Sequence, residues 1–145
     1  MTSGLRLVLD TNVLVAASRS STGASFALLR ALRERRFTAL LSVPLLLEYE
    51  AVLCRPLQLQ ASGRSMEQTQ AFLDAFCLYA DAVTLHYLWR PQLRDPADEM
   101  VLETALNGRA DALVTLNGRD FAVAPSFGLH VRTPGEMLNF LIKKD

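Results

Sequence analysis

Short apolar runs alternate along the chain with longer segments in which apolar residues recur every three or four positions. The runs predict buried strands at residues 5–9, 38–42, 82–88, 112–115 and 129–132. The longer segments predict helices at 13–18, 24–36, 45–54, 66–79, 96–107 and 134–143. Strands and helices in this order form a parallel sheet with right-handed crossovers and helices on both faces. We therefore expect a single domain over residues 1–145. Its fold class is α/β, a three-layer α/β/α sandwich with a mostly parallel sheet of four or five strands.

One segment breaks the alternation. Pro56 and the Gln- and Ser-rich residues 58–65 carry no apolar period and predict a loop. The segment is too short to link two domains, so we expect it to lie within one.

The composition is that of a compact soluble protein. Half of the 145 residues are hydrophobic and 21% are charged. No apolar run approaches the roughly 18 residues of a membrane span, and the N-terminus lacks the features of a secretory signal, so we expect a cytoplasmic protein without membrane contact. Cys54 and Cys77 belong to no CxxC pair and are expected to be small buried hydrophobes.

The charges cancel overall, with 15 basic and 15 acidic residues, so net charge does not indicate nucleic acid binding. Their distribution is uneven. Acidic residues crowd the segment 95–103, and a basic rim beside an acidic pocket could hold a phosphodiester over metal ions. For the arginines alone, a solvated helix face is the favoured explanation. These arginines are Arg19, Arg30, Arg33, Arg35 and Arg36.

Asp10 directly follows the first predicted strand. Ligands of open α/β sheets bind outside the carboxyl ends of the strands, so a carboxylate in this place is a site candidate. Asp10 or Thr11 could instead cap the helix that follows. Taken alone, the position leaves both interpretations open.

The helix 96–107 places a second carboxylate on its apolar side. Asp98 falls near the centre of the expected buried stripe, whereas Glu103 and Asn107 are expected to face solvent. Asp95 before Pro96 has a structural explanation as a helix N-cap. Because burying an unpaired carboxylate is costly, Asp98 requires a cation, hydrogen-bond donors or an open cleft. The stripe consists of Val101, Leu102, Ala105 and Leu106.

The helix 45–54 is apolar nearly all round but carries Glu48 and Glu50. Periodicity does not decide which of the two points into a site, although we expect that one does. Asn117 and Asp120 follow the strand 112–115, where they could equally form an ordinary turn.

Together, Asp10, one of the two glutamates, Asp98, Asn117 and Asp120 would form a cluster of oxygen ligands. Such clusters suit Mg²⁺ or Mn²⁺, and one or two of these ions can activate water for phosphodiester cleavage. The sequence offers no His/Cys set for zinc, because His86 and His130 stand alone and are read as ordinary surface or core residues.

Four stretches of the chain carry a resemblance to a known family. They are LVLDTNVLVAA, SVPLLLEYEAVLCRP, RDPADEMVLETALNGRADALVTLNGRDF and LHVRTPGEML, and their order and spacing are specific together. The sequence resembles the PIN-domain ribonucleases, in particular the VapC-like toxins of bacterial type II toxin–antitoxin systems.

The resemblance implies roles for individual residues. The family's first three acidic positions fall on Asp10, Glu48 and Asp98, which selects Glu48 over Glu50. The family's Thr-x-Asp motif reads Thr115-Leu116-Asn117 here, so the side chain keeps an oxygen ligand but loses a charge. Asp120 matches a further acidic position. Asn12 and Thr115 are similar to polar residues that support the site.

The function that the resemblance implies is a metal-dependent endoribonuclease. Asp10, Glu48, Asp98 and Asp120 would be catalytic, and Asp10, Asp98, Asn117 and Asp120 would hold Mg²⁺ or Mn²⁺ while a metal-bound water attacks the phosphorus. The resemblance also implies an RNA product with 3′-hydroxyl and 5′-phosphate ends, a homodimer, and a cognate antitoxin.

Two other classes of function are possible for this pattern. The first is a PIN-fold module that binds RNA or protein without catalysis, which Asn117 and the neutral net charge would suit. The second is a receiver-like domain that accepts a phosphoryl group on Asp10. The second is the weaker hypothesis, because the chain lacks the acidic pair and the late lysine expected of such domains.

Overall fold

The computed structural model describes residues 4–88 and 90–144 and contains a five-stranded parallel sheet. The spatial order of the strands is β3-β2-β1-β4-β5, and every neighbouring pair is parallel. The predicted α/β fold with a parallel sheet is therefore confirmed. The strands are β1 (Arg6–Leu9), β2 (Thr38–Leu41), β3 (Ala80–Ala82), β4 (Ala112–Val114) and β5 (His130–Arg132).

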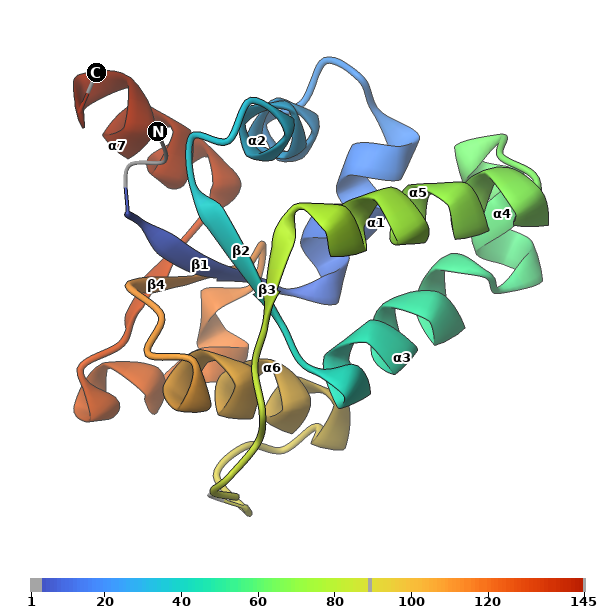
Figure 1. Ribbon diagram of the computed structural model, residues 1–145. Helices are drawn as coiled ribbons and strands as arrows, with labels where there is room; N and C mark the ends of the chain where they lie inside the picture. The colour runs from blue at the N-terminus through green and yellow to red at the C-terminus, as the bar shows by residue number, and fades with distance from the viewer. Residues whose placement is uncertain (1–3, 89, 145) are drawn as a thin grey trace.

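Helices cover both faces of this sheet (Figure 1). The helices α1, α2, α5 and α7 lie on one face, and α6 lies on the other with the 3₁₀ turns η1 and η2. At the edge of the sheet, α3 contacts both α1 and α6. The helices are α1 (Thr11–Arg19), α2 (Ala24–Arg33), α3 (Val43–Leu53), α4 (Pro56–Ser62), α5 (Met66–Leu78), α6 (Pro96–Asn107) and α7 (Pro134–Lys144), with η1 (Gly118–Phe121) and η2 (Ala124–Phe127).

The central strand β1 forms the middle of the core. Leu7, Val8 and Leu9 are fully buried, as expected for a strand covered on both faces. On one side β1 pairs with β2, and on the other Leu9 pairs with Val114 of β4. The chain runs outward from β1 to β2 and β3 before it crosses to β4. The carboxyl ends of β1 and β4 therefore flank the point where the strand order reverses, a usual ligand site in such sheets.

Side-chain caps start α3, α5, α6 and α7, with reciprocal hydrogen bonds between Thr133 and Glu136 at α7. Ser42 accepts a hydrogen bond from the Leu45 amide at the start of α3, and Ser65 and Gln68 form a reciprocal capping box on α5. At α6, the Asp95 carboxylate accepts a hydrogen bond from the Ala97 amide at 2.9 Å. This last cap fixes the first turn of the helix that carries Asp98.

The loop predicted at residues 58–65 is wrong, because Pro56–Ser62 form α4 and the left-handed Gly63 ends it. The helix is anchored to α1 by a polar side chain, so its sequence lacks the regular apolar spacing that predicts a helix. Gln58 is buried, accepts hydrogen bonds from Arg19 on α1 and donates one to Ser18. The expectation of two buried cysteines is wrong for Cys77, which is exposed, while Cys54 is half-buried.

The strand predicted at 82–88 is also wrong, because β3 ends at Ala82. Residues 84–88 and 90–94, which we call the strap, instead run along α6. Asn107 accepts hydrogen bonds from the amides of His86 and Tyr87 at 2.9 and 3.0 Å. The prediction that Glu103 and Asn107 face solvent is therefore wrong. Glu103 is fully buried and Asn107 is half-buried beneath the strap.

Within the described residues, no helix combines the length and the apolar character that crossing a membrane requires.

Candidate active site

A cleft of about 250 Å³ opens where β1 and β4 end, between α1, α3, α6 and η1. Five carboxylates from four separate parts of the chain line it, together with Thr11, Asn12 and small or apolar side chains. None of the lining residues in the described part of the chain is basic. The carboxylates are those of Asp10, Glu48, Asp95, Asp98 and Asp120.

Asp10 sits at the N-cap position of α1, but its side chain makes no capping hydrogen bond. Its exposed fraction is only 6%, and its Oδ2 atom accepts a hydrogen bond from the Thr115 hydroxyl at 2.7 Å. Burial raises the pKa of Asp10, while the hydrogen bonds from Thr115 and from the Thr11 backbone oppose this rise. The structure therefore places Asp10 in the cleft, with its side chain turned away from a capping role.

Thr115 and Asn12 connect β1 and β4 behind Asp10. The Asn12 amide nitrogen donates to the Thr115 hydroxyl at 3.4 Å, and the Asn12 oxygen accepts from the Leu116 backbone amide at 3.3 Å. The Asn117 backbone amide also donates to the Thr115 hydroxyl, at 3.0 Å. With these donors in place, the hydroxyl proton of the buried Thr115 points at Asp10.

Asp98 lies in the first turn of α6, half-buried and facing the cleft. Burial raises the pKa of its carboxyl, and the nearby negative charges raise it further, to about 7. Asp95 also lines the cleft while it caps α6, a second role that the sequence did not reveal because capping alone explained the residue. The charges that act on Asp98 are those of Asp10, Asp95, Asp120 and Glu48.

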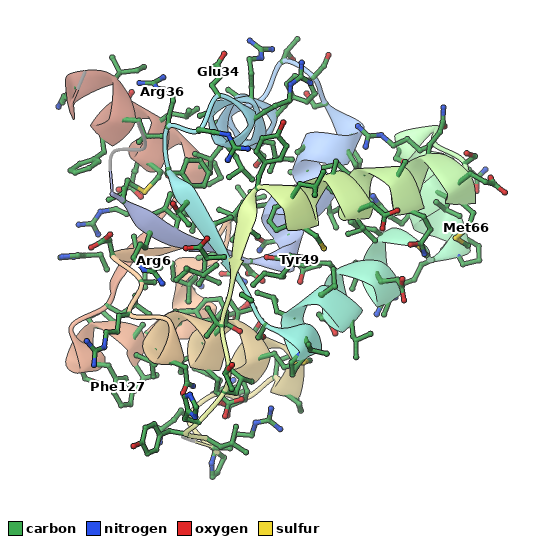
Figure 2. All side chains as sticks on the ribbon, in the orientation of Figure 1. Arg6, Glu34, Arg36, Tyr49, Met66 and Phe127 are labelled. Atoms are coloured by element: carbon green, nitrogen blue, oxygen red, sulfur yellow. The ribbon has the colours of Figure 1, made fainter. Side chains whose placement is uncertain are left out.

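Glu48 and Glu50 leave α3 in different directions. Glu48 is half-buried and lines the cleft, whereas Glu50 is exposed and accepts a hydrogen bond from Gln70 on α5. Between them, the fully buried Tyr49 donates its hydroxyl to the Leu9 carbonyl, directly before Asp10 (Figure 2). Tyr49 thus ties α3 to the end of β1, a role that its apolar sequence context did not indicate.

Asp120 enters the cleft from η1, but Asn117 does not line it. The Asn117 side-chain amide donates to the Asp120 carboxylate at 2.9 Å. Asn117 thus orients Asp120, whereas its predicted role as a metal ligand remains a prediction.

None of the arginines at positions 19–36 lines the acidic cleft, so they do not form the basic rim that the sequence left less favoured than a solvated helix face. Arg30 and Arg33 line a different cavity of about 520 Å³, between α1, α2 and α5, where Arg30 stacks on Phe26. Arg36 donates to the Leu141 carbonyl of α7, on the far side of the sheet from α6 (Figure 2). The basic residues next in sequence to the cleft carboxylates are Arg94 and Arg119, and both are exposed.

The donor set of the cleft suits a hard divalent cation, because every charged group is a carboxylate. The raised pKa of Asp98 indicates negative charge that no basic lining residue offsets, and a cation would relieve it. Among the described residues, no three Asp, Glu, His or Cys side chains already converge tightly enough to enclose an ion. Carboxylates repel one another without a counter-charge, so this spacing is compatible with an ion that draws them together.

The sequence matches the family model of the PIN domain over residues 6–119. The chain belongs to the PIN-domain family. PIN domains are generally nucleases that use divalent metal ions, in agreement with the chemistry of the cleft. No curated protein sequence matches the chain.

The PIN fold is also found among solved structures. The chain is similar to one in the crystal structure of VapBC2 from Rickettsia felis bound to a DNA fragment from their promoter. The two are 19% identical, with a TM-score of 0.61 over 89% of this chain and 98% of the other. At this identity the similarity establishes the fold alone.

Proposed function

We propose that this PIN domain is a Mg²⁺- or Mn²⁺-dependent endoribonuclease that acts as the cytoplasmic toxin of a type II toxin–antitoxin pair. The observation that carries the proposal is the convergence of five carboxylates on one cleft, with the pKa of Asp98 raised to about 7. Carboxylates held together at the cost of mutual repulsion are typical of a functional site.

Asp10 and Asp98 would hold the metal ion, with Asp120 as a further ligand that Asn117 orients. A bound ion supplies activation of water and neutralises charge at the scissile phosphate. Thr115 holds Asp10 in its charged form by donating a hydrogen bond to it. Glu48 faces these groups from α3, where it is placed to accept a proton.

Cleavage of a fluorophore–quencher single-stranded RNA in the presence of Mg²⁺ or Mn²⁺ tests this proposal. We expect Asp10→Asn to lower kcat/KM by more than about a hundredfold, because it removes a charged ligand from the site. Asp74→Asn, which changes an exposed carboxylate of α5, is the matched control and should retain wild-type activity. Equal cleavage by wild type and Asp10→Asn would refute the assignment.

Calorimetric titration with Mn²⁺ separates the nuclease from a PIN-fold module that only binds RNA or protein. If the protein is the nuclease, Mn²⁺ should bind to the wild type and should bind less tightly to Asp98→Asn. The absence of heat in both proteins would favour the binding module.

The antitoxin partner is proposed because the VapBC2 structure contains two proteins of one such system. The test is to co-express this chain with the product of the neighbouring reading frame and to measure RNA cleavage by the purified complex. A stable complex with suppressed cleavage is expected. A neighbour that neither co-purifies nor inhibits would count against this part of the proposal.

A homodimer is proposed because α3 exposes apolar side chains one turn apart. Val43 is 70% exposed and Leu47 is 58% exposed. We expect Leu47→Lys to shift the protein toward monomer in sedimentation equilibrium. Leu57→Lys on α4, at a side chain that is 79% exposed, is the control and should leave the dimer intact. A wild-type protein that sediments as a monomer would contradict the proposal.

A further inference from the structure

The strap (residues 84–88 and 90–94) is held against α6 by three side chains spaced four residues apart on one face of that helix. Asn107 binds the backbone of His86 and Tyr87, and it also donates to the Tyr87 carbonyl at 2.9 Å. Glu103 pairs with the Arg90 guanidinium at 2.9 Å, and Glu99 accepts from the amides of Gln92 and Leu93 at 2.8 and 2.9 Å. The polar backbone groups of the strap are thus bound on the side that faces α6.

The other side of the strap exposes side chains that suit single-stranded nucleic acid. Tyr87 is 69% exposed and Leu88 is 64% exposed, and His86 and Arg94 are exposed as well. Sites for single strands combine cationic groups, which bind phosphates, with aromatic rings, on which unpaired bases stack. The hydrogen bonds with Asn107 fix the backbone of Tyr87, so that less conformational freedom of this segment is lost on binding.

The strap leads directly into the acidic cleft. Its last residue, Arg94, precedes Asp95, which lines the cleft and caps α6. The strap runs antiparallel to α6 from there, so Tyr87 is bound at Asn107, nine residues along the helix from Asp98. At 1.5 Å per residue this is a separation of roughly 13 Å along the helix axis. The backbone of the strap therefore extends outward from the cleft beside α6, and Figure 1 shows its course past that helix.

The charges around the cleft oppose the approach of a polyanion such as RNA, so cationic side chains are needed beside the cleft. The cleft presents five carboxylates, and the arginines of α2 lie at the other cavity. Coulomb repulsion from the carboxylates opposes a phosphate backbone near the cleft unless cations lie beside it. Arg94 is an exposed cation at the cleft end of the strap, and the exposed Tyr87 lies farther along the same segment.

We propose that the exposed side of the strap binds the single-stranded RNA substrate on its way into the cleft, with Tyr87 stacked on an unpaired base and Arg94 paired with a phosphate. This inference rests on the proposed nuclease function, whose substrate it assigns to a track along α6. It makes Tyr87 and Arg94 binding residues that set substrate affinity, outside the metal site.

The test measures RNA affinity without catalysis. A fluorescein-labelled single-stranded RNA of about 12 nucleotides is titrated with full-length protein in EDTA and followed by fluorescence anisotropy. We expect Tyr87→Ala to raise Kd by about tenfold and Tyr87→Phe to retain the affinity, because phenylalanine preserves the stacking face. Arg94→Gln should raise Kd several-fold and lower the slope of log Kd against log salt by about 1.

Matched controls lie away from the strap. Phe140→Ala removes an exposed aromatic of α7 and Arg33→Gln removes an exposed arginine of α2, and both should bind like wild type. A duplex RNA of the same sequence supplies a further control. Tyr87→Ala should leave duplex affinity unchanged, because paired bases are not available to stack on the tyrosine.

Wild-type affinity in both Tyr87→Ala and Arg94→Gln would overturn the proposal and leave the strap as a surface for another partner. Equal weakening by Arg33→Gln and Arg94→Gln would overturn it too, because binding would then follow overall charge. The nuclease proposal fails on a different result, namely the absence of metal-dependent cleavage by the wild type. Loss of affinity in the strap variants without wild-type cleavage would retain the strap as a surface that binds single-stranded RNA, but would reject both the nuclease and the assignment of the bound RNA as its substrate.

Discussion

Thr115 favours the charged form of Asp10 through a hydrogen bond of 2.7 Å. Asp10 is buried, and burial alone favours its neutral form, whereas the Thr115 hydroxyl donates to the carboxylate and favours the charged form. The hydroxyl does so because Asn12 and the Asn117 amide occupy its acceptor side. The proposed metal ligand Asp10 is thus kept charged with the help of Thr115, which does not itself line the cleft.

Thr115→Val is expected to raise the pKa of Asp10, because burial persists while the opposing hydrogen bond is lost. The acidic limb of the pH–rate profile for RNA cleavage should therefore move to higher pH. Thr115→Ser keeps the hydroxyl and should keep the wild-type limb. If the limb of the valine variant coincides with that of the wild type, Thr115 has no part in setting the charge of Asp10.

Asp98 makes the metal-free protein less stable as the pH rises. Folding raises its pKa from the ordinary 3.8 to about 7, so the folded protein keeps a proton that the unfolded chain has already released. The stabilising contribution is fully present below pH 3.8 and is lost as the pH rises through about 7. Above that value Asp98 is charged in both states and adds no further slope.

Asp98→Asn should therefore gain stability over the wild type as the pH increases toward 8. Urea unfolding in EDTA at pH 5, 6, 7 and 8 measures the free energies of unfolding. Asp74→Asn, at an exposed carboxylate, is the control that should not show this trend. A constant difference between Asp98→Asn and wild type across these pH values would show that Asp98 titrates in its ordinary range.

At the scale of elements, α6 shows what a hydrophobic period can and cannot reveal. Asp95-Pro96 predicts where the helix begins. The spacing of Val101, Leu102 and Ala105 predicts its apolar stripe, and these three side chains are buried. The opposite side has the polar residues of a solvated face, yet the strap covers it. Glu103 is buried there because its partner Arg90 lies on the strap, a segment without a regular apolar pattern. One sequence alone does not indicate that this segment and α6 are in contact.

Arg90→Ala is expected to lower the free energy of unfolding by about 2 kcal/mol, because it leaves the fully buried Glu103 without its cation. The figure lies below that for a fully buried pair, since the Arg90 side chain is 46% exposed. Adding Glu103→Gln to this variant should recover much of the loss by removing the unpaired charge. Urea unfolding of the three proteins is the measurement. A loss below about 0.5 kcal/mol for Arg90→Ala would mean that water replaces the guanidinium.

At the scale of the whole molecule, the sheet gathers side chains that no local pattern joins. The strand and helix alternation predicted the parallel sheet, and parallel strands place Asp10 and Thr115 at one edge. The position of Glu48 and the second role of Asp95 depend on how α3 and α6 pack across that edge. Packing of this kind is set by side chains from several helices, and periodicity within one helix does not encode it.

Mn²⁺ is expected to stabilise the whole domain, because an ion bound between β1, α6 and η1 links segments that separate on unfolding. At about 100 times its Kd the ion should add about 2.7 kcal/mol to the free energy of unfolding of the wild type. Asp10→Asn should gain clearly less. Thermal unfolding with and without Mn²⁺ checks this, and an equal rise in Tm for both proteins would place the ion elsewhere.

The hydrogen bond between Thr115 and Asp10 joins residues that are 105 positions apart. A nascent chain that emerges from the ribosome carries Asp10 and Glu48 long before it carries α6, Thr115 and Asp120. Before residue 95 has been made, β1 lacks its β4 neighbour and the cleft lacks Asp95, Asp98 and Asp120, which are three of its five carboxylates. The proposed nuclease therefore lacks a complete cleft during most of its own translation, because Thr115 and Asp120 belong to the last quarter of the chain to be made.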